Sequence, residues 1–331
     1  MMYGAQAWSL QDNSGQTASG LLKPLKKVQN KCLRRITGGY KRTPTAALER
    51  EAQVQPLDLY AETIALQRAS ATKDHLVNQR ILDAANKIWN QMAVNRQAPN
   101  PTQLRRRRQR GTLPQPPTGL EKLWAKAAAR ENEVVDFEEA RRSQRQASAA
   151  TRKCRRQAGA NSSRRQLKGT TLIARWAELE WRKRWMKAAE GKQATTWRNP
   201  WETKTLSLYE GLPKHQATAL FLLRTEVLGL NAWLASVGVP DILPRCACGW
   251  QAQTVRHVIL QCPDFADSRT ELILRTGTED LQEMLSRPKN TKEVAKWFVQ
   301  QGILEQFNTA KEIEAEDATQ YIPFQELDSW T

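Results

Sequence analysis

Residues Cys246–Cys262, with the sequence CACGWQAQTVRHVILQC, decide how the C-terminal part of this chain folds. They bring four sulfur and imidazole side chains into one short segment, spaced Cys-x-Cys-x8-His-x4-Cys: Cys246, Cys248, His257 and Cys262. Tetrahedral zinc prefers such ligands, and Gly249 gives the backbone the freedom that a tight turn between the first two needs. We expect a short helix to carry the other two. The sequence predicts one structural Zn2+ ion; the alternative is a chance cluster of buried thiols beside a surface histidine.

The charge of the chain indicates an acidic partner. The 331 residues carry a formal net charge of +17. Residues 99–198 alone hold 25 lysines and arginines against 9 aspartates and glutamates, a net charge of +16, so the remainder is close to neutral. An acidic polymer, RNA or DNA, is therefore the expected partner class. We expect no small-molecule substrate.

Cysteine usage and hydropathy restrict the cellular setting. An odd count of five cysteines, three of them in the metal-like cluster, argues against a disulfide scaffold. No run approaches eighteen apolar residues, and the first ten residues lack the pattern of a secretory signal. We therefore expect a reducing compartment, the nucleus or the cytoplasm, and no membrane.

Periodicity and composition predict a mainly α fold in four parts. Residues 1–98 are expected to be helical, and residues 99–168 a basic, Pro- and Arg-rich, poorly ordered linker with one helix over 119–142. Residues 169–275 are expected to form a small Trp-rich helical domain that ends in the zinc knuckle. Residues 276–331 are expected to be helical and then acidic and frayed. A chain of this length allows about two domains.

Helix signals in the first part are strong. Apolar residues recur at steps of three and four between Leu21 and Ile36, and Gly38 and Gly39 follow. Thr45 is a plausible N-cap for the next helix. Pro56 stands where a further helix starts, over Leu57–Ala71, and Asp74 is a plausible cap for a helix over 73–95.

Three groups of residues are candidates for contact with nucleic acid. The basic run of the linker suits phosphate: Arg105, Arg106, Arg107, Arg108 and Arg110. Three cations lie between Trp181 and Trp185, aromatics that can stack on bases: Arg182, Lys183 and Arg184. Three residues flank the metal ligands: Arg245, Trp250 and Arg256. For the basic run of the linker, the alternative is a solvated segment that binds nothing. For the stretch from Trp181 to Trp185, it is a helical core built on the tryptophans, which we favour. For the three residues that flank the ligands, it is a set of ordinary surface side chains.

Several stretches of the chain resemble the C-terminal part of LINE-type, non-LTR retrotransposon reverse transcriptases, in particular those of fungal Tad-like elements. The matching stretches cover roughly 1–95 and 170–275 of the chain: Tyr3–Trp8, Leu25–Tyr40 (LKKVQNKCLRRITGGY), Thr43–Tyr60, Trp181–Trp185, Leu220–Leu234 (LFLLRTEVLGLNAWL) and the knuckle followed by Pro263. The resemblance implies that residues 1–98 correspond to a thumb-like region after the polymerase palm. It also implies that the parent activity is RNA-directed DNA polymerisation.

The catalytic residues of that family have no match here. A reverse transcriptase needs carboxylates that hold two Mg2+ ions, and this chain has no Asp-Asp pair. Phe265–Ser268 has one Asp at the wrong end of the chain and is rejected as a catalytic turn. Gly119–Ala129 resembles the closing helix of a ribonuclease H domain without its Asp, which implies a remnant of a deleted domain. We predict no catalytic residues.

The function expected from these observations is a non-catalytic C-terminal fragment of a reverse transcriptase polyprotein. It would bind RNA or DNA through its basic segments and its zinc knuckle. Two alternatives remain open at this point. The chain is the tail of a full polymerase whose palm lies upstream, or it is a decayed transposon relic without function.

Overall fold

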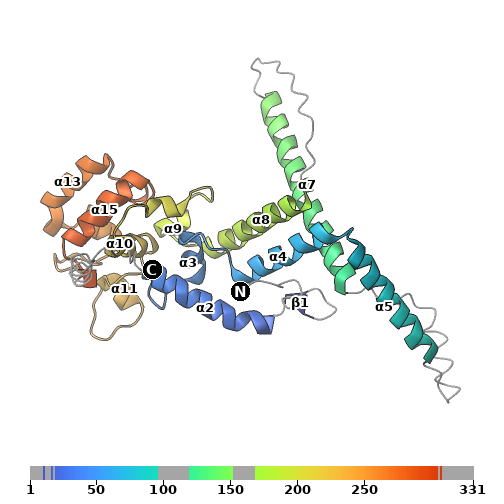
Figure 1. The fold of residues 1–331 in the computed structure, drawn as a ribbon. Helices are drawn as coiled ribbons and strands as arrows, with labels where there is room; N and C mark the ends of the chain where they lie inside the picture. The colour runs from blue at the N-terminus through green and yellow to red at the C-terminus, as the bar shows by residue number, and fades with distance from the viewer. Residues whose placement is uncertain are drawn as a thin grey trace, which may run out of the picture. The chain divides into compact units, whose positions relative to one another are not determined.

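The computed structural model describes the fold over residues 10–11, 16–17, 19–95, 119–151, 168–304 and 306–307. The predicted mainly α fold is confirmed over these residues (Figure 1). The chain divides into two compact units that cut across the four predicted parts. Unit 1 comprises Met1–Lys27 and Pro56–Arg184, and unit 2 comprises Val28–Gln55 and Trp185–Thr331.

Unit 1 is built from long helices and one minimal hairpin. Its elements are β1 (Leu10–Gln11), β2 (Gln16–Thr17), the first part of α2 (Ser19–Thr37), α4 (Leu57–Thr72), α5 (Leu76–Asn95), α7 (Gly119–Thr151) and α8 (Gly169–Ala189) as far as Arg184. The two strands pair antiparallel, with Leu10 opposite Thr17. Leu59 and Leu66 of α4 pack with Leu123 of α7 and with Ile173 and Trp176 of α8 to form the core.

Helix α7 lies in the segment predicted to be a linker, and it runs beyond the predicted 119–142. Its first half packs against α4. Leu123, Ala127 and Val134 are buried there, at steps of four and seven residues that place them on one helical face. The average composition of residues 99–168 conceals this narrow apolar stripe, because Arg, Gln and Glu fill the other positions.

Unit 2 is a cluster of shorter helices. Its elements are the remainder of α2, α3 (Thr45–Glu51), the end of α8, α9 (Thr195–Arg198), η2 (Thr205–Leu208), α10 (Lys214–Thr225), α11 (Asn231–Ser236), α12 (Val255–Leu260), η3 (Pro263–Phe265), α13 (Ala266–Thr276), α14 (Leu281–Met284) and α15 (Pro288–Gln300). Helices α10 and α15 pack together at its centre. Their buried faces contribute Leu220, Phe221, Val294 and Phe298 to the largest apolar core of the described residues.

Most predicted helix ends are correct to within a few residues, but two of the predicted caps are wrong. Helix α2 ends at Thr37, where Gly38 takes a left-handed φ of 72°. Thr45 is the first residue of α3 and does not cap it; Pro44 occupies the N-cap position. Before α5, it is Nδ1 of His75 that accepts a hydrogen bond from the Val77 amide, at 3.2 Å, in place of the predicted Asp74. The two predicted caps, Thr45 and Asp74, each lie one residue away from the residue that takes the capping position.

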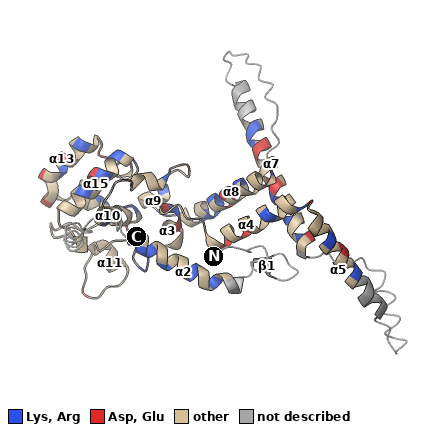
Figure 2. Cartoon of the chain, viewed as in Figure 1, with Lys and Arg blue, Asp and Glu red and all other residues tan. Residues whose placement is uncertain are grey.

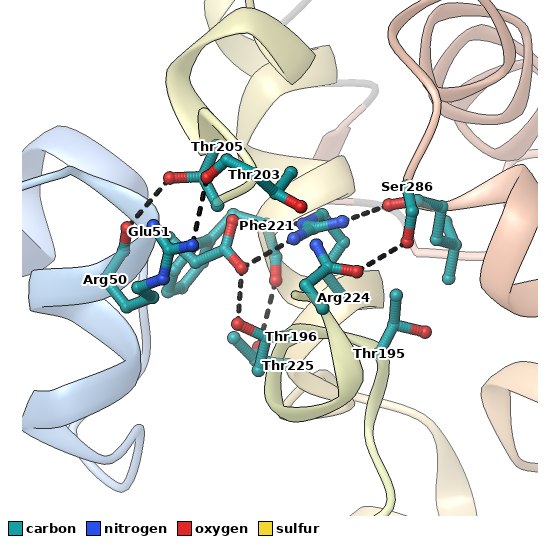
Figure 3. A network of polar contacts seen from close by, with 12 residues as sticks. Arg50, Glu51, Thr195, Thr196, Thr203, Thr205, Phe221, Arg224, Thr225 and Ser286 are labelled. Carbon is teal, nitrogen blue, oxygen red and sulfur yellow. Dashed lines mark hydrogen bonds and ion pairs between the residues drawn. The ribbon is translucent and has the colours of Figure 1, made fainter. Parts of the chain in front are cut away.

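A buried polar network joins α3 to the C-terminal part of unit 2 (Figure 3). Arg224 of α10 donates to both carboxylate oxygens of Glu51, at 2.8 and 3.0 Å, and both side chains are at most 1% exposed. The Tyr209 hydroxyl donates to the same carboxylate at 2.6 Å, and Thr196 donates to it as well. Arg224 also donates to the carbonyl of Leu285. The pair is thus fully enclosed, and each member has several partners.

The neighbouring Arg50 makes its own set of bonds. Its guanidinium donates to the backbone carbonyls of Trp201 and Thr203, at 2.6 and 2.9 Å, while the Thr205 hydroxyl donates to the Arg50 carbonyl at 2.8 Å.

Burial alone would raise the pKa of Glu51, but the Arg224 guanidinium holds that pKa below its usual value. The carboxylate is therefore ionised inside the core.

Candidate metal centre

The four side chains that the sequence singled out converge in unit 2. Sγ of Cys246 lies 3.9 Å from Sγ of Cys262, and Sγ of Cys248 lies 3.3 Å from Nε2 of His257. All four ligand atoms lie within 4.8 Å of one another. A tetrahedral ion with metal–sulfur bonds of about 2.3 Å requires edges of about 3.8 Å between sulfurs. The group can therefore hold a metal ion with little movement of its side chains.

A tight turn positions the first two ligands. The Gly249 amide donates to the Cys246 carbonyl at 3.0 Å, and the Cys246 amide donates to the Trp250 carbonyl at 2.9 Å. Gly249 has a φ of 89°, a left-handed conformation that a side chain would oppose. The turn lets two cysteines with a single residue between them point at one centre.

Helix α12 positions the other two ligands. The Thr254 hydroxyl caps this helix by accepting from the His257 amide at 3.1 Å, and Val258 and Ile259 anchor it in the core of unit 2. The helix ends at Leu260. Cys262 therefore lies after the helix, whereas the sequence predicted that the helix would carry it. The Cys262 amide instead donates to the His257 carbonyl at 2.7 Å, which turns the thiol back toward the centre.

The imidazole ring of His257 is covered by Trp250. The two rings are stacked, with centroids 5.7 Å apart and planes 5° from parallel. Trp250 is nevertheless 56% exposed, whereas His257 is buried. Nδ1 of His257 has no hydrogen-bond partner among the described residues. The stack with Trp250, and not a second hydrogen bond, is thus the contact that orients the imidazole in the described structure.

Burial favours the neutral forms of Cys262 and His257. It raises the pKa of the Cys262 thiol to about 12 and lowers the pKa of His257, to which the nearby Arg269 guanidinium also contributes. Arg269 donates to the Cys262 carbonyl at 2.8 Å and so braces the turn. A metal cation supplies the positive charge that allows such thiols to bind as thiolates.

The flanking candidates lie at the surface around this centre. Arg245 and Arg256 are exposed and are chain neighbours of the ligands Cys246 and His257. The Arg245 carbonyl accepts a bond from the Asn231 side chain at 2.8 Å, which fixes its backbone while its side chain faces solvent. Two exposed cations and one exposed aromatic ring are therefore close neighbours in sequence of the metal ligands.

The second group of candidates is engaged within unit 1. Lys183 pairs with Glu133 at 2.9 Å, Arg184 pairs with Asp58 at 2.9 Å, and Arg182 is half-buried beside them on α8. Trp181 packs against the core of unit 1. These contacts favour the core interpretation for this stretch over a base-stacking one.

The neighbouring Trp185, which belongs to unit 2, is also a core residue. It is only 4% exposed and stacks on Trp197, with ring centroids 4.6 Å apart.

The arginines of the linker lie outside the described residues: Arg105, Arg106, Arg107, Arg108 and Arg110. Among the helices that the structure describes, none has the length and apolar character needed to cross a bilayer.

Sequence reasoning missed the residues that support the ligands. Thr254 and Arg269 hold the two ends of the helix–turn segment that carries His257 and Cys262. The Thr254 signal was available, since a threonine before an apolar run is a typical N-cap. The role of Arg269 depends on the return of α13 toward the knuckle and has no local signal.

A comparison of this chain with models of known protein families, with curated proteins and with solved structures found no match.

Proposed function

We propose that this chain is a zinc-dependent RNA- or DNA-binding protein, a non-catalytic fragment descended from the C-terminal part of a LINE-type reverse transcriptase polyprotein. The observation that carries the proposal is the convergence of four soft ligands, with an exposed Trp250 stacked on one of them and two exposed arginines next to them in sequence. The origin of the chain rests on the sequence resemblance alone. An upstream open frame coding for a Tyr-x-Asp-Asp motif would make the chain the tail of a polymerase instead.

The donor set favours zinc among the biological metals. Three thiolates and one imidazole in a tetrahedral arrangement are typical of structural zinc sites. The four side chains would occupy all four positions of such an ion, which would leave no open position for a substrate water. The proposed role of the ion is therefore to fold the knuckle.

The surface above the ion suits a nucleic-acid strand. Arg245 and Arg256 can neutralise phosphates, and the exposed ring of Trp250 can stack on an unpaired base. Because Trp250 also stacks on the ligand His257, zinc would fix the orientation of the aromatic platform. Binding would then depend on the metal and weaken with salt.

The test is a binding titration with the full, zinc-loaded chain and labelled single-stranded RNA, followed by fluorescence anisotropy. We expect Trp250→Ala to weaken binding by about 1–3 kcal/mol, roughly five- to 150-fold, because a base loses its stacking partner. Leu243→Ala, at another exposed position of the same loop region, serves as the matched control and should bind as the parent does. Equal affinities of the parent and Trp250→Ala at low salt would contradict the proposed platform.

A further inference from the structure

One stretch of the chain combines many cations with no carboxylate. Residues 13–48 contain eight lysines and arginines and not one aspartate or glutamate. Figure 2 shows the result on α2, which carries blue segments and no red ones. Four of these cations are exposed in unit 2, and none forms an ion pair with a carboxylate of the described residues: Lys31, Arg35, Lys41 and Arg42.

The fold holds these four cations close together. Lys31 and Arg35 are one helical turn apart on the same face of α2. Arg34, between them in sequence, donates to the carbonyls of Lys41 and Thr43, at 3.1 and 2.8 Å. The loop that carries Lys41 and Arg42 is thereby fixed against the last turns of the helix.

A further cation reinforces the cluster. Nζ of Lys214 donates to the carbonyls of Arg35 and Ile36 at the C-terminus of α2. The negative end of the helix dipole partly stabilises positive charge at this position. The helix dipole does not neutralise the cluster. A polyanion would neutralise it, and would release its own condensed counterions as it binds.

A chain of contacts within unit 2 connects this cluster to the metal centre. Tyr40, next to Lys41, contacts Trp233 of α11 with ring centroids 5.5 Å apart. At the start of α11, the Asn231 side chain donates to the Arg245 carbonyl at 2.8 Å. Trp233 and Asn231 are neighbours but one on helix α11, so about 3 Å of helix rise separates the two contacts.

The alternative partner for a basic helix is an anionic membrane surface. A helix that lies on a membrane buries its apolar face among the lipid headgroups. Part of the apolar side of α2 is instead used inside the protein, since Leu33 is 2% exposed and belongs to the core of unit 2, while Val28 and Ile36 remain exposed. A linear array of phosphates fits a row of cations without requiring that apolar face.

We propose that Lys31, Arg35, Lys41 and Arg42 form a second phosphate-binding surface, independent of the metal, that contacts the backbone of the RNA or single-stranded DNA bound at the knuckle. The inference rests on the proposed function for the nature of its ligand. The surface itself needs no zinc and reads no sequence, because phosphate contacts position a strand without identifying its bases.

The test compares the full zinc-loaded chain with a variant in which all four residues are alanine, using single-stranded RNA of about sixteen nucleotides. Each lost phosphate contact reduces the slope of log K against log salt by about 0.7. We expect the slope to fall by about 3 and the affinity at about 0.1 M salt to fall at least tenfold. A slope equal to that of the parent would overturn the proposal.

Two controls separate this surface from net charge and from misfolding. Replacing four other exposed lysines of unit 2 by alanine removes the same charge: Lys204, Lys289, Lys292 and Lys296. This variant should change the slope by less than the amount expected for one phosphate contact. A fall in slope equal to that of the four-alanine variant would also overturn the proposal. The charge-conserving variant Lys31→Arg and Lys41→Arg should bind as the parent does, and the double variant Lys41→Ala and Arg42→Ala should lose about half of the slope change.

Further arms distinguish the second surface from the proposed function. The four-alanine change should reduce the slope equally in a Cys248→Ser background, where the knuckle has lost a ligand. If Trp250→Ala weakens binding and the four-alanine change does not, the second surface fails and the proposed function stands. If the parent binds no RNA and the four residues matter only for phosphatidylserine vesicles, both proposals fail.

Discussion

Replacement of Glu51 by glutamine is expected to lower the free energy of unfolding of unit 2 by about 3–5 kcal/mol, because it leaves the Arg224 charge buried without its counterion. The amide keeps the size of the carboxylate, so packing around Tyr209 and Thr196 changes little. Denaturant unfolding followed by circular dichroism measures the loss. Glu210→Gln makes the same chemical change at an exposed site and should stay within about 0.5 kcal/mol of the parent.

The double variant Glu51→Leu and Arg224→Met removes both charges together. It should recover most of the loss, since apolar replacements of a buried pair are often close to neutral. A loss below about 1 kcal/mol for Glu51→Gln alone would contradict the assignment of an uncompensated buried charge.

The same network predicts sensitivity to acid. The pKa of Glu51 in the folded chain is lowered, so its contribution to stability is complete above the unfolded pKa and is lost as pH falls through the folded pKa. The parent should therefore lose stability in acid more steeply than Glu51→Gln does. Thermal melts between neutral pH and pH about 3 compare the two slopes.

Replacement of Cys248 by serine is expected to have the second large effect. It removes one of four ligands, so the bound zinc per chain should fall well below one and residues 240–275 should exchange amide hydrogens faster. Structural zinc contributes about 10–16 kcal/mol of apparent binding free energy in small folded sites, so the loss of one ligand should strongly loosen the segment that carries the ligands. Metal analysis and hydrogen exchange by mass spectrometry measure both effects.

The matched control is Cys32→Ser, which alters an exposed thiol outside the cluster. Its zinc content and its exchange at residues 240–275 should equal those of the parent. Full retention of zinc by Cys248→Ser would sink the four-ligand assignment, whereas loss of zinc in both variants would indicate general unfolding.

Local signals explain what the sequence predicted well. Helix α2 has strong apolar periodicity, and Gly38 and Pro56 mark the end of α2 and the start of α4, so both helices were located almost to the residue. The metal ligands all fall within one short segment, so their proximity required no knowledge of the tertiary fold. Each of these features is determined by neighbours along the chain.

Features that depend on distant segments could not be predicted in the same way. Glu51 and Arg224 are 173 positions apart. Arg224 follows Leu220 by four residues and Phe221 by three, which places it on the apolar face of its helix, but nothing local identifies Glu51 as its partner. The cations of α8 lie in a basic run, yet Glu133 and Asp58 from other helices pair with them. The expectation of a nucleic-acid partner rests on charge and aromatic content and stays a prediction, while the structure shows which of these described cations remain exposed.

The assembly of unit 2 from two separated segments has a consequence for biosynthesis. Glu51 leaves the ribosome 173 residues ahead of Arg224, a delay of roughly ten to thirty seconds at ordinary translation rates. During that interval α3 has a carboxylate without its counterion and an uncovered apolar side at Leu48. The nascent chain should therefore engage holdase chaperones until α10 is made, and slow codons between the two segments should lengthen that dependence.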